Sequence, residues 1–484
     1  MLKGSFWTAV VLTVAALVGA AGYAPEARAG TDFCFEQFGP TIDTYAWDIA
    51  LAAFPDGRVA ASYVRDRTEV WYAELNGCTW DKSLVCACDA GESADWMRTS
   101  IAILPWGEPA IAYCRLDDVT GEGSMWYSWR EQGLWRHERV TDPAAGNVAG
   151  QRCSLGVSSV GEAAVGYAYW SIDDLHTHTA VAWRAAPNSW QSRDVDSVWW
   201  NQYGGYWSPA ASLVFQYPGQ AVISYYFGDE GENDSYSLRV ATGQGWPFDR
   251  MFTDFDPSQS AYMGMCSKVA VDSAGHPAAA YVKDAWPPSS LNLWLRYAEF
   301  DGDTWQVEQS FGGDPIPVVG APDNRSGGVG IGMLAGDQPA IACTVRVESA
   351  PFTCLAWREG GTWRRGAIFG EWWPPVADAG ALIVTASGHP AVPYYRGGFP
   401  DLTYVNYAVG WRLCRGDTNC DGRVTFGDID RFVAAIGNNR AAWRATFGSE
   451  CPTCCFWNCD ANGDGSVTFA DIDPFVALIG TTCP

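Results

Sequence analysis

From residue 47 to residue 413 the apolar residues fall in short runs that are separated by glycine-containing turns. These runs lack the period of an amphipathic helix, and their length and bounding turns are typical of β-strands. One order of features recurs seven times: an apolar strand, a glycine turn, a second strand ending near tyrosine, an aromatic third strand, a turn and a tryptophan. Four short strands at a regular spacing are the pattern of a β-propeller blade.

The repeat predicts a mainly β fold with about seven blades, at about 47–88, 97–142, 151–197, 207–254, 264–312, 326–371 and 378–413. The first turns of the blades are Asp56-Gly57, Trp106-Gly107, Val160-Gly161, Pro218-Gly219, Ala274-Gly275, Gly336-Asp337 and Ser387-Gly388. The closing tryptophans are Trp80, Trp135, Trp190, Trp246, Trp305, Trp363 and Trp411, which we expect to pack within or between blades. Residues 30–46, with Cys34, are a candidate edge strand that would close the ring, a point that the sequence leaves open.

The C-terminal segment 414–484 contains one twelve-residue pattern twice, at 417–428 and at 460–471. Calcium takes oxygens from side chains at loop positions 1, 3, 5 and 12 and from the backbone carbonyl at position 7, and glycine at position 6 permits the bend. Both copies match at every one of these positions, which disfavours chance richness in Asp and Asn. The segment therefore predicts a pair of calcium-binding loops.

Each loop is expected to continue into a short helix with one apolar stripe. The stripes are Ile429, Phe432, Val433 and Ile436 in the first copy and Ile472, Phe475, Val476 and Ile479 in the second. Val424 and Val467, both at loop position 8, are predicted to pair with each other.

The paired loops resemble the dockerin module, whose repeats also end in Asp at position 12; the resemblance covers about 414–484. It implies a small α-helical domain with EF-hand-like loops that holds two Ca²⁺ ions and attaches a secreted polysaccharide-degrading enzyme or accessory protein to a cohesin-like partner. The implied ligands of one ion are Asp417, Asn419, Asp421, Arg423 through its carbonyl, Thr425 and Asp428. Those of the other are Asp460, Asn462, Asp464, Ser466 through its carbonyl, Thr468 and Asp471.

Two features depart from the dockerin pattern. Positions 10 and 11, which are small polar residues in many dockerins, are Phe426-Gly427 and Phe469-Ala470 here. The linker between the loops is long and contains Cys451, Cys454, Cys455 and Cys459. Calcium binding therefore transfers from the resemblance more directly than the cohesin partner does.

Residues 1–29 have the features of an export signal. Lys3 provides a charged start, an apolar run extends from Phe6 to Ala21, and Ala27-Arg-Ala29 forms a small-x-small cleavage site. The alternative is an uncleaved membrane anchor, which the short apolar core and the following cleavage site disfavour. We expect a secreted or cell-surface protein without a membrane span in the mature chain.

Sixteen cysteines suit disulfides in an oxidising compartment. The sequence suggests one bridge across a hairpin, between Cys343 and Cys354, and another that clasps the loop module, between Cys414 and Cys483. Zinc at Cys86-x-Cys88 or at 451–455 is the alternative, although zinc-finger spacing is missing.

The formal net charge of −24 disfavours nucleic acid as a partner, since its binding requires phosphate neutralisation by Lys and Arg.

The connections between second and third strands and between blades are long and varied, whereas the other turns are short, so binding is expected on the long-loop face. Aromatic rings can stack on sugars, and the candidate ligand-binding residues there are Trp199, Trp200, Trp207, Trp286, Trp372 and Trp373. The alternative is that these tryptophans cover blade seams.

Two further segments are candidate sites. The acidic loop 229–234 could bind calcium or supply a carboxylate pair, and Asp173-Asp174-Leu175-His176-Thr177-His178 could bind a metal.

The leading interpretation is a secreted calcium-binding protein whose propeller recognises extracellular polysaccharide or protein and whose dockerin-like module tethers it to a larger assembly. A glycoside hydrolase or polysaccharide lyase with its active site on the long-loop face is the first alternative, although hydrolase and nucleotide-binding motifs are missing from the sequence. A structural cell-surface protein is the second.

Overall fold

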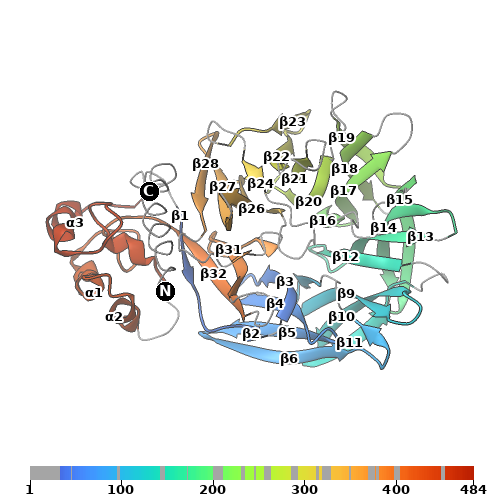
Figure 1. The fold of residues 1–484 in the computed structure, drawn as a ribbon, viewed down its shortest axis with the longest axis horizontal. Coiled ribbons are helices and arrows are strands. Elements are labelled where there is room, and N and C mark those ends of the chain that lie inside the picture. Colours follow the sequence, from blue (N-terminus) through green and yellow to red (C-terminus); the bar gives the residue numbers. More distant parts are fainter. Residues whose placement is uncertain are drawn as a thin grey trace, which may run out of the picture.

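In the computed structural model the described strands form a ring of seven four-stranded blades, followed by a small helical module (Figure 1). The structure describes residues 33–44, 46–94, 99–141, 148–171, 173–199, 211–229, 235–244, 247–255, 263–284, 293–311, 316–318, 329–347, 350–368, 376–377, 381–396, 404–447 and 453–483. The predicted fold class is confirmed.

The strands of each blade follow one another from the inside of the ring outward. Blade 1 consists of β3 (Ala46–Ala53), β4 (Val59–Arg65), β5 (Glu69–Asn76) and β6 (Thr79–Ala87). Blade 2 consists of β8 (Ser100–Ile103), β9 (Pro109–Asp117), β10 (Gly123–Glu131) and β11 (Leu134–Arg139). Blade 3 consists of β12 (Val148–Val157), β13 (Ala163–Ser171), β14 (His176–Ala186) and β15 (Ser189–Trp199). Blade 4 consists of β16 (Ser212–Tyr217), β17 (Gln220–Asp229), β18 (Ser235–Gln244) and β19 (Asp249–Phe255). Blade 5 consists of β20 (Met263–Val271), β21 (Pro277–Asp284), β22 (Leu293–Phe300) and β23 (Trp305–Glu308). Blade 6 consists of β25 (Val329–Leu334), β26 (Gln338–Val347), β27 (Ala350–Glu359) and β28 (Thr362–Ala367).

Blade 7 combines the two ends of the propeller. It contains β30 (Ile383–Val384), β31 (Pro390–Arg396), β32 (Tyr404–Arg412) and, as its outer strand, β1 (Phe33–Gln37), which pairs antiparallel with β32. The N-terminal segment with Cys34 therefore closes the ring, which answers the question that the sequence left open. The short strands β2 (Asp43–Thr44), β7 (Glu92–Ser93) and β29 (Val376–Ala377) extend individual sheets, whereas β24 (Pro317–Val318) pairs with both β22 and β26 and so links blades 5 and 6.

The second strand of each blade is a continuous apolar run because neighbouring blades cover both of its faces. In β4 and in β9 every residue from the first to the sixth is buried. The predicted first turns also occur as expected: Gly57 has a φ of +92° and Gly388 a φ of +80°, and glycine adopts this left-handed backbone without strain.

The predicted tryptophans pack between blades. Trp135 and Trp190 each lie edge-on against a tyrosine of the preceding blade, with ring centroids 5.4 Å from Tyr72 and 5.3 Å from Tyr127. Trp363 makes the same contact with Tyr297 at 5.1 Å. Trp246 lies outside the described residues.

The assignment of Trp411 as a closing tryptophan is wrong. Trp411 belongs to the third strand of blade 7, and the residue after it, Arg412, pairs with Phe33 of β1. Arg130 and Arg184 pair with the closing tryptophans of their own blades in the same way. Phe33 therefore occupies the closing position, and its ring packs against a residue of the preceding blade, Trp357, at 5.1 Å.

A set of ion pairs that the sequence analysis missed links the blades. In each of six consecutive seams, an arginine on the third strand of one blade binds a carboxylate of the preceding blade. The pairs are Arg130–Glu74, Arg184–Glu138, Arg239–Asp196, Arg296–Asp254, Arg358–Glu299 and Arg412–Glu359. At the seventh seam Lys82 lies 3.3 Å from Asp43, and Tyr63 donates to the same carboxylate at 2.7 Å.

Replacing Glu138 by alanine is expected to destabilise the propeller by about 3 kcal/mol, because a largely buried guanidinium loses its partner. Glu138 is 2% exposed and accepts hydrogen bonds from Arg184 Nε at 2.9 Å and Nη2 at 2.6 Å, and from Trp190 Nε1 at 2.9 Å. Denaturant unfolding measures the change. Glu131→Ala is the matched control, since Glu131 forms an exposed pair with Arg136; equal losses in the two variants would contradict this account.

The C-terminal module contains the short helices η2 (Phe426–Asp428), α1 (Ile429–Ala435), α2 (Arg440–Ala445), η3 (Phe456–Cys459), η4 (Phe469–Asp471) and α3 (Ile472–Leu478). Its core is built around Phe432 and Phe475, which stack with ring centroids 4.4 Å apart. Within the described ranges, no helix is both long and apolar enough to cross a membrane.

Candidate functional site

The first calcium-like loop is organised by its own carboxylates. Asp417, at position 1, accepts hydrogen bonds from the backbone N–H groups of Asp421 at 3.1 Å and Gly422 at 3.0 Å. Asp428, at position 12, accepts from the N–H groups of Asn419 at 3.0 Å and Thr425 at 2.7 Å. These bonds hold oxygen-bearing residues from both ends of the loop around one centre.

The second loop repeats this arrangement. Asp460 accepts from the N–H groups of Asp464 at 3.1 Å and Gly465 at 3.0 Å. Asp471 accepts from the N–H groups of Asn462 at 3.0 Å and Thr468 at 2.8 Å. The structure therefore places the predicted ligand positions of both loops in equivalent surroundings.

The electrostatics of the loops fit a divalent cation. Burial, together with the neighbouring Asp428 and Asp421 carboxylates, raises the pKa of Asp417 to about 6, against the lowering effect of hydrogen bonds from backbone N–H groups. Burial also raises the pKa of Asp460, although Arg415 opposes the shift. Crowded carboxylates that are costly to ionise together, surrounded by amide, hydroxyl and carbonyl oxygens, form the donor set that calcium prefers.

The two position-8 valines do not pair with each other as predicted. Val424 exchanges backbone hydrogen bonds with the end of the second half, donating to Thr481 O at 3.0 Å and accepting from Gly480 N at 2.8 Å. Val467 instead accepts from Gly437 N at 2.8 Å, at the end of the first half. Each loop is thus closed by the chain that follows the other half's helix.

The predicted apolar stripes are only partly buried. Phe432 and Phe475 lie in the core, but Val433 and Val476 are both 57% exposed. Phe426 and Phe469, at loop position 10, are 76% and 77% exposed. Each half of the module therefore presents an equivalent exposed apolar pair, Phe426 with Val433 and Phe469 with Val476.

The module is attached to the strand that closes the propeller. A disulfide joins Cys34 of β1 to Cys455. Glu36, also on β1, is 2% exposed and lies 3.1 Å from Arg440 and 3.4 Å from Arg444, which belong to α2. Figure 1 shows the module beside β1, at the edge of blade 7. The loop module and the ring closure are therefore physically connected.

The other cysteine predictions had mixed outcomes. Cys414–Cys483 is a disulfide, as suggested, and Cys420–Cys454 is a further one. Cys343 and Cys354 lie opposite each other on β26 and β27 but are not disulfide-bonded. Zinc binding by the 451–455 cluster is contradicted, because the sulfurs of Cys454 and Cys455 are consumed in disulfides. The three disulfides within the described residues fit an extracellular protein.

The histidine pair predicted to bind a metal is engaged differently. Both ring nitrogens of His178 face carboxylates, with Nδ1 3.0 Å from Asp194 and Nε2 3.0 Å from Asp174. The Tyr169 ring stacks on the imidazole at 4.6 Å. Because neither nitrogen of His178 is left for an ion, its geometry favours a structural imidazolium over a metal ligand. The Nδ1 of His176 lies 2.7 Å from the backbone oxygen of Asp174.

A pH dependence of stability follows from this cluster. Hydrogen bonding to Asp194 raises the pKa of His178, and Asp174 adds to the shift against the effect of burial. Because the pKa is raised on folding, protonated His178 stabilises the folded state. This stabilisation is complete below the unfolded-state pKa of about 6.5 and is lost as the pH rises through the folded-state pKa. At acidic pH we expect the free energy of unfolding of wild type to exceed that of His178→Gln by about 1 kcal/mol. The difference is this small because both carboxylates are half-exposed, so solvent screens their interaction with the imidazolium. Unfolding curves across pH test this, and a pH-independent difference would contradict it.

The candidate tryptophans on the long-loop face cannot be placed. Trp200, Trp207, Trp286, Trp372 and Trp373 lie outside the described residues. Trp199 ends β15, but its side chain is outside the described set, as is most of the loop 229–234. Their proposed role remains a prediction.

No protein-family model matches the chain, and no curated protein matches it in sequence. Solved structures similar to it include an α-L-arabinanase from Penicillium chrysogenum, with 12% identity, a TM-score of 0.41 and coverage of 64% of this chain and 92% of that one. A fucose-specific lectin from Aleuria aurantia shares 11% identity over 69% of this chain and all of its own, with a TM-score of 0.41. The polysaccharide lyase Uly1 shares 10% identity over 81% of this chain and 94% of its own, with a TM-score of 0.44. At these values the likenesses assign no activity to this chain.

Proposed function

We propose that this is an exported protein that binds two calcium ions in its C-terminal module and uses this module to attach its propeller to a larger extracellular assembly. The observation that carries the proposal is the repeated loop geometry, in which position-1 and position-12 carboxylates accept the same backbone hydrogen bonds in both halves. Calcium would supply the positive charge that balances these carboxylates, and the loops would provide the six oxygen positions named from the sequence.

The proposed partner of the module is a cohesin-like protein with a complementary apolar surface. Two exposed apolar pairs, Phe426 with Val433 and Phe469 with Val476, support this choice. Large apolar side chains exposed at equivalent positions of both halves are costly unless a partner covers them. Aromatic rings in place of the small polar residues of many dockerins imply a more apolar contact.

The proposed ligand of the propeller is an extracellular polysaccharide. Support comes from the long connections on one face and from the tryptophans predicted there, whose rings can stack on sugar faces. Residues 1–29, with the apolar run and the site Ala27-Arg-Ala29, support export to the compartment where such polymers occur.

Native electrophoresis of the mature protein in gels that contain different polysaccharides, with calcium present, tests this function. We expect retarded migration in at least one gel with the polymer left intact. Replacing Trp199, Trp200, Trp372 and Trp373 by alanine is expected to abolish the retardation while leaving the unfolding transition in place. A cleared zone would indicate a polysaccharide-degrading enzyme instead, and unretarded migration in every gel would contradict polysaccharide recognition.

A further inference from the structure

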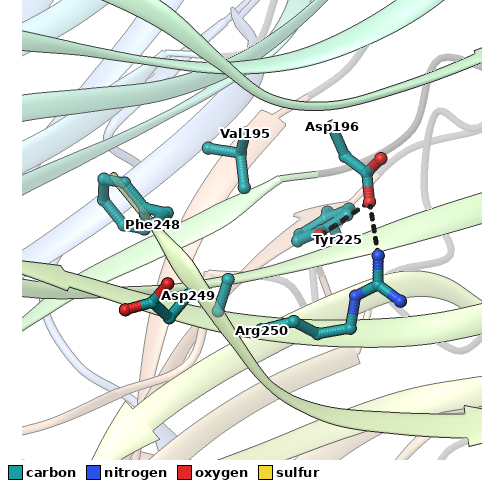
Figure 2. A pocket seen from close by; sticks show the side chains of 7 residues that line it. Val195, Asp196, Tyr225, Phe248, Asp249 and Arg250 are labelled. Carbon is teal, nitrogen blue, oxygen red and sulfur yellow. Dashed lines mark hydrogen bonds and ion pairs between the residues drawn. The ribbon is translucent and has the colours of Figure 1, made fainter. Parts of the chain in front are cut away.

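A cavity of about 290 Å³ lies at the seam between blades 3 and 4. It is formed by the outer strand of blade 3, β15, and by β17, β18 and the start of β19 in blade 4 (Figure 2). The lining residues are Val195, Asp196, Tyr225, Ala241, Phe248, Asp249 and Arg250. The size is at the small end of ligand pockets, which suits one small molecule or one residue of a polymer.

The cavity combines a rigid floor with an accessible polar edge. Tyr225 and Ala241 are each 1% exposed and belong to the packed interior of blade 4. Phe248 is half-buried, whereas Asp249 and Arg250 are exposed. Figure 2 shows the Arg250 guanidinium next to the Asp196 carboxylate, with Phe248 across the cavity from them. A ligand would therefore meet apolar and polar groups on different sides.

The polar groups are arranged around the Asp196 carboxylate. Tyr225 donates its hydroxyl hydrogen to Asp196 at 3.1 Å, and Arg239 forms an ion pair with the same carboxylate. Arg250 Nη2 lies 3.6 Å from Asp196, beyond hydrogen-bond length, and its side chain is 50% exposed. The fixed carboxylate and tyrosine oxygens can accept, and the guanidinium of Arg250 offers N–H donors that a ligand can reach.

The charge balance selects the class of ligand. Asp196 and Asp249 carry two negative charges, and Arg239 and Arg250 carry two positive charges, so the site has no net charge to attract either an anion or a cation. A site that offers both acceptors and donors beside an aromatic ring suits a neutral polyhydroxylated ring, whose hydroxyl groups both donate and accept while its C–H face packs on the aromatic side chain.

We propose that this seam cavity binds one neutral sugar residue, with Arg250 donating to ring hydroxyl groups, the carboxylates accepting from them and Phe248 packing against the apolar face of the ring. The inference rests on the proposed polysaccharide recognition and names a site for it that lies at a blade seam. Hydrogen bonds to charged groups contribute about 1.5–3 kcal/mol, so the loss of the Arg250 contacts weakens binding by roughly tenfold to a hundredfold.

Ligand-observed saturation-transfer NMR on the mature protein tests the site, with glucose, galactose, mannose, xylose, arabinose and fucose as separate probes. Wild type is expected to transfer saturation to at least one of them. Arg250→Lys keeps the positive charge but removes the planar fork of donors, and Asp249→Asn removes one carboxylate; both are expected to lose most of the signal. Arg136→Lys is the control, because Arg136 is an exposed arginine on β11, in blade 2, 52% exposed and away from the cavity.

The outcomes separate this site from the wider proposal. Equal signals in wild type and in the Arg250→Lys and Asp249→Asn variants, or an equal loss in Arg136→Lys, would overturn the cavity as the sugar site. No saturation transfer from wild type to any probe, with retardation in polysaccharide gels retained, would also overturn it while polysaccharide recognition stands. A third outcome is saturation transfer that wild type and Arg136→Lys show and only the two cavity variants lose, without retardation in any gel. This outcome would support the cavity as a sugar site and contradict polysaccharide recognition.

Discussion

Replacing Asp421 and Asp464 together by alanine is expected to abolish high-affinity calcium binding. Each aspartate stands at position 5 of its loop, where the sequence predicts a calcium ligand. It also organises the loop, since its carboxylate accepts a hydrogen bond from the N–H group two residues on, at 3.0 Å for Asp421 and 2.9 Å for Asp464. The loss of one charged ligand per ion should weaken each site by roughly a hundredfold or more. Isothermal titration calorimetry measures the affinity and the number of ions bound.

Asp430→Ala with Asp473→Ala provides the matched control. These two aspartates lie on α1 and α3, two residues after the end of each loop, and both are exposed. The control removes the same charge from the same module but no predicted ligand, so it should bind two ions nearly as wild type does. Unchanged calcium uptake in the Asp421 and Asp464 variant would place the ions elsewhere, with the acidic loop 229–234 as the next candidate.

Removal of the Cys34–Cys455 disulfide is expected to destabilise the ring closure by about 2–4 kcal/mol. This bond spans 421 residues of sequence and fixes the short strand β1 to the module. Without it, five residues of backbone pairing with β32 and the ion pairs of Glu36 remain to hold the strand. Cys34→Ala with Cys455→Ala should therefore lower the unfolding temperature of the propeller and speed amide hydrogen exchange in residues 33–37.

Cys420→Ala with Cys454→Ala is the control for this effect. It removes a disulfide of which both cysteines lie in the C-terminal module, so it should affect the module but leave the exchange of β1 slow. Slow exchange of residues 33–37 in the Cys34 and Cys455 variant as well would show that backbone pairing with β32 is sufficient to close the ring.

The propeller was predictable because each blade is encoded locally. A glycine turn such as Asp56-Gly57 and a tryptophan such as Trp135 mark the strand boundaries within a single repeat. The closure of the ring depends instead on Phe33 pairing with Arg412, across almost the whole chain, and a local pattern cannot reveal such a pairing. The third-strand tryptophans Trp129 and Trp357 are followed by arginine, as Trp411 is, but so are the closing tryptophans Trp135 and Trp363, so the local sequence did not show to which strand Trp411 belongs.

The same difference between local and long-range encoding explains which sites were predictable from the sequence. The calcium-like loops are contiguous, so twelve residues contain the whole donor set and its glycine hinge. The seam cavity brings Asp196 of blade 3 to Arg250 of blade 4, and the module contact brings Glu36 to Arg440. Neither pair has a recognisable spacing in the sequence. The exposure of Val433 was also missed, because a helical stripe does not reveal that the small module covers only part of it.

Scanning calorimetry of the mature protein with calcium and with EGTA tests the central claim, that calcium maintains the folded C-terminal module behind the propeller. On the proposal that calcium orders these loops, EGTA is expected to remove the transition of the module or to shift it to much lower temperature. The propeller should keep a separate transition, lowered in temperature because Arg440 and Arg444 no longer hold Glu36 in place. A single transition that EGTA does not move would contradict calcium binding as the function of the paired loops.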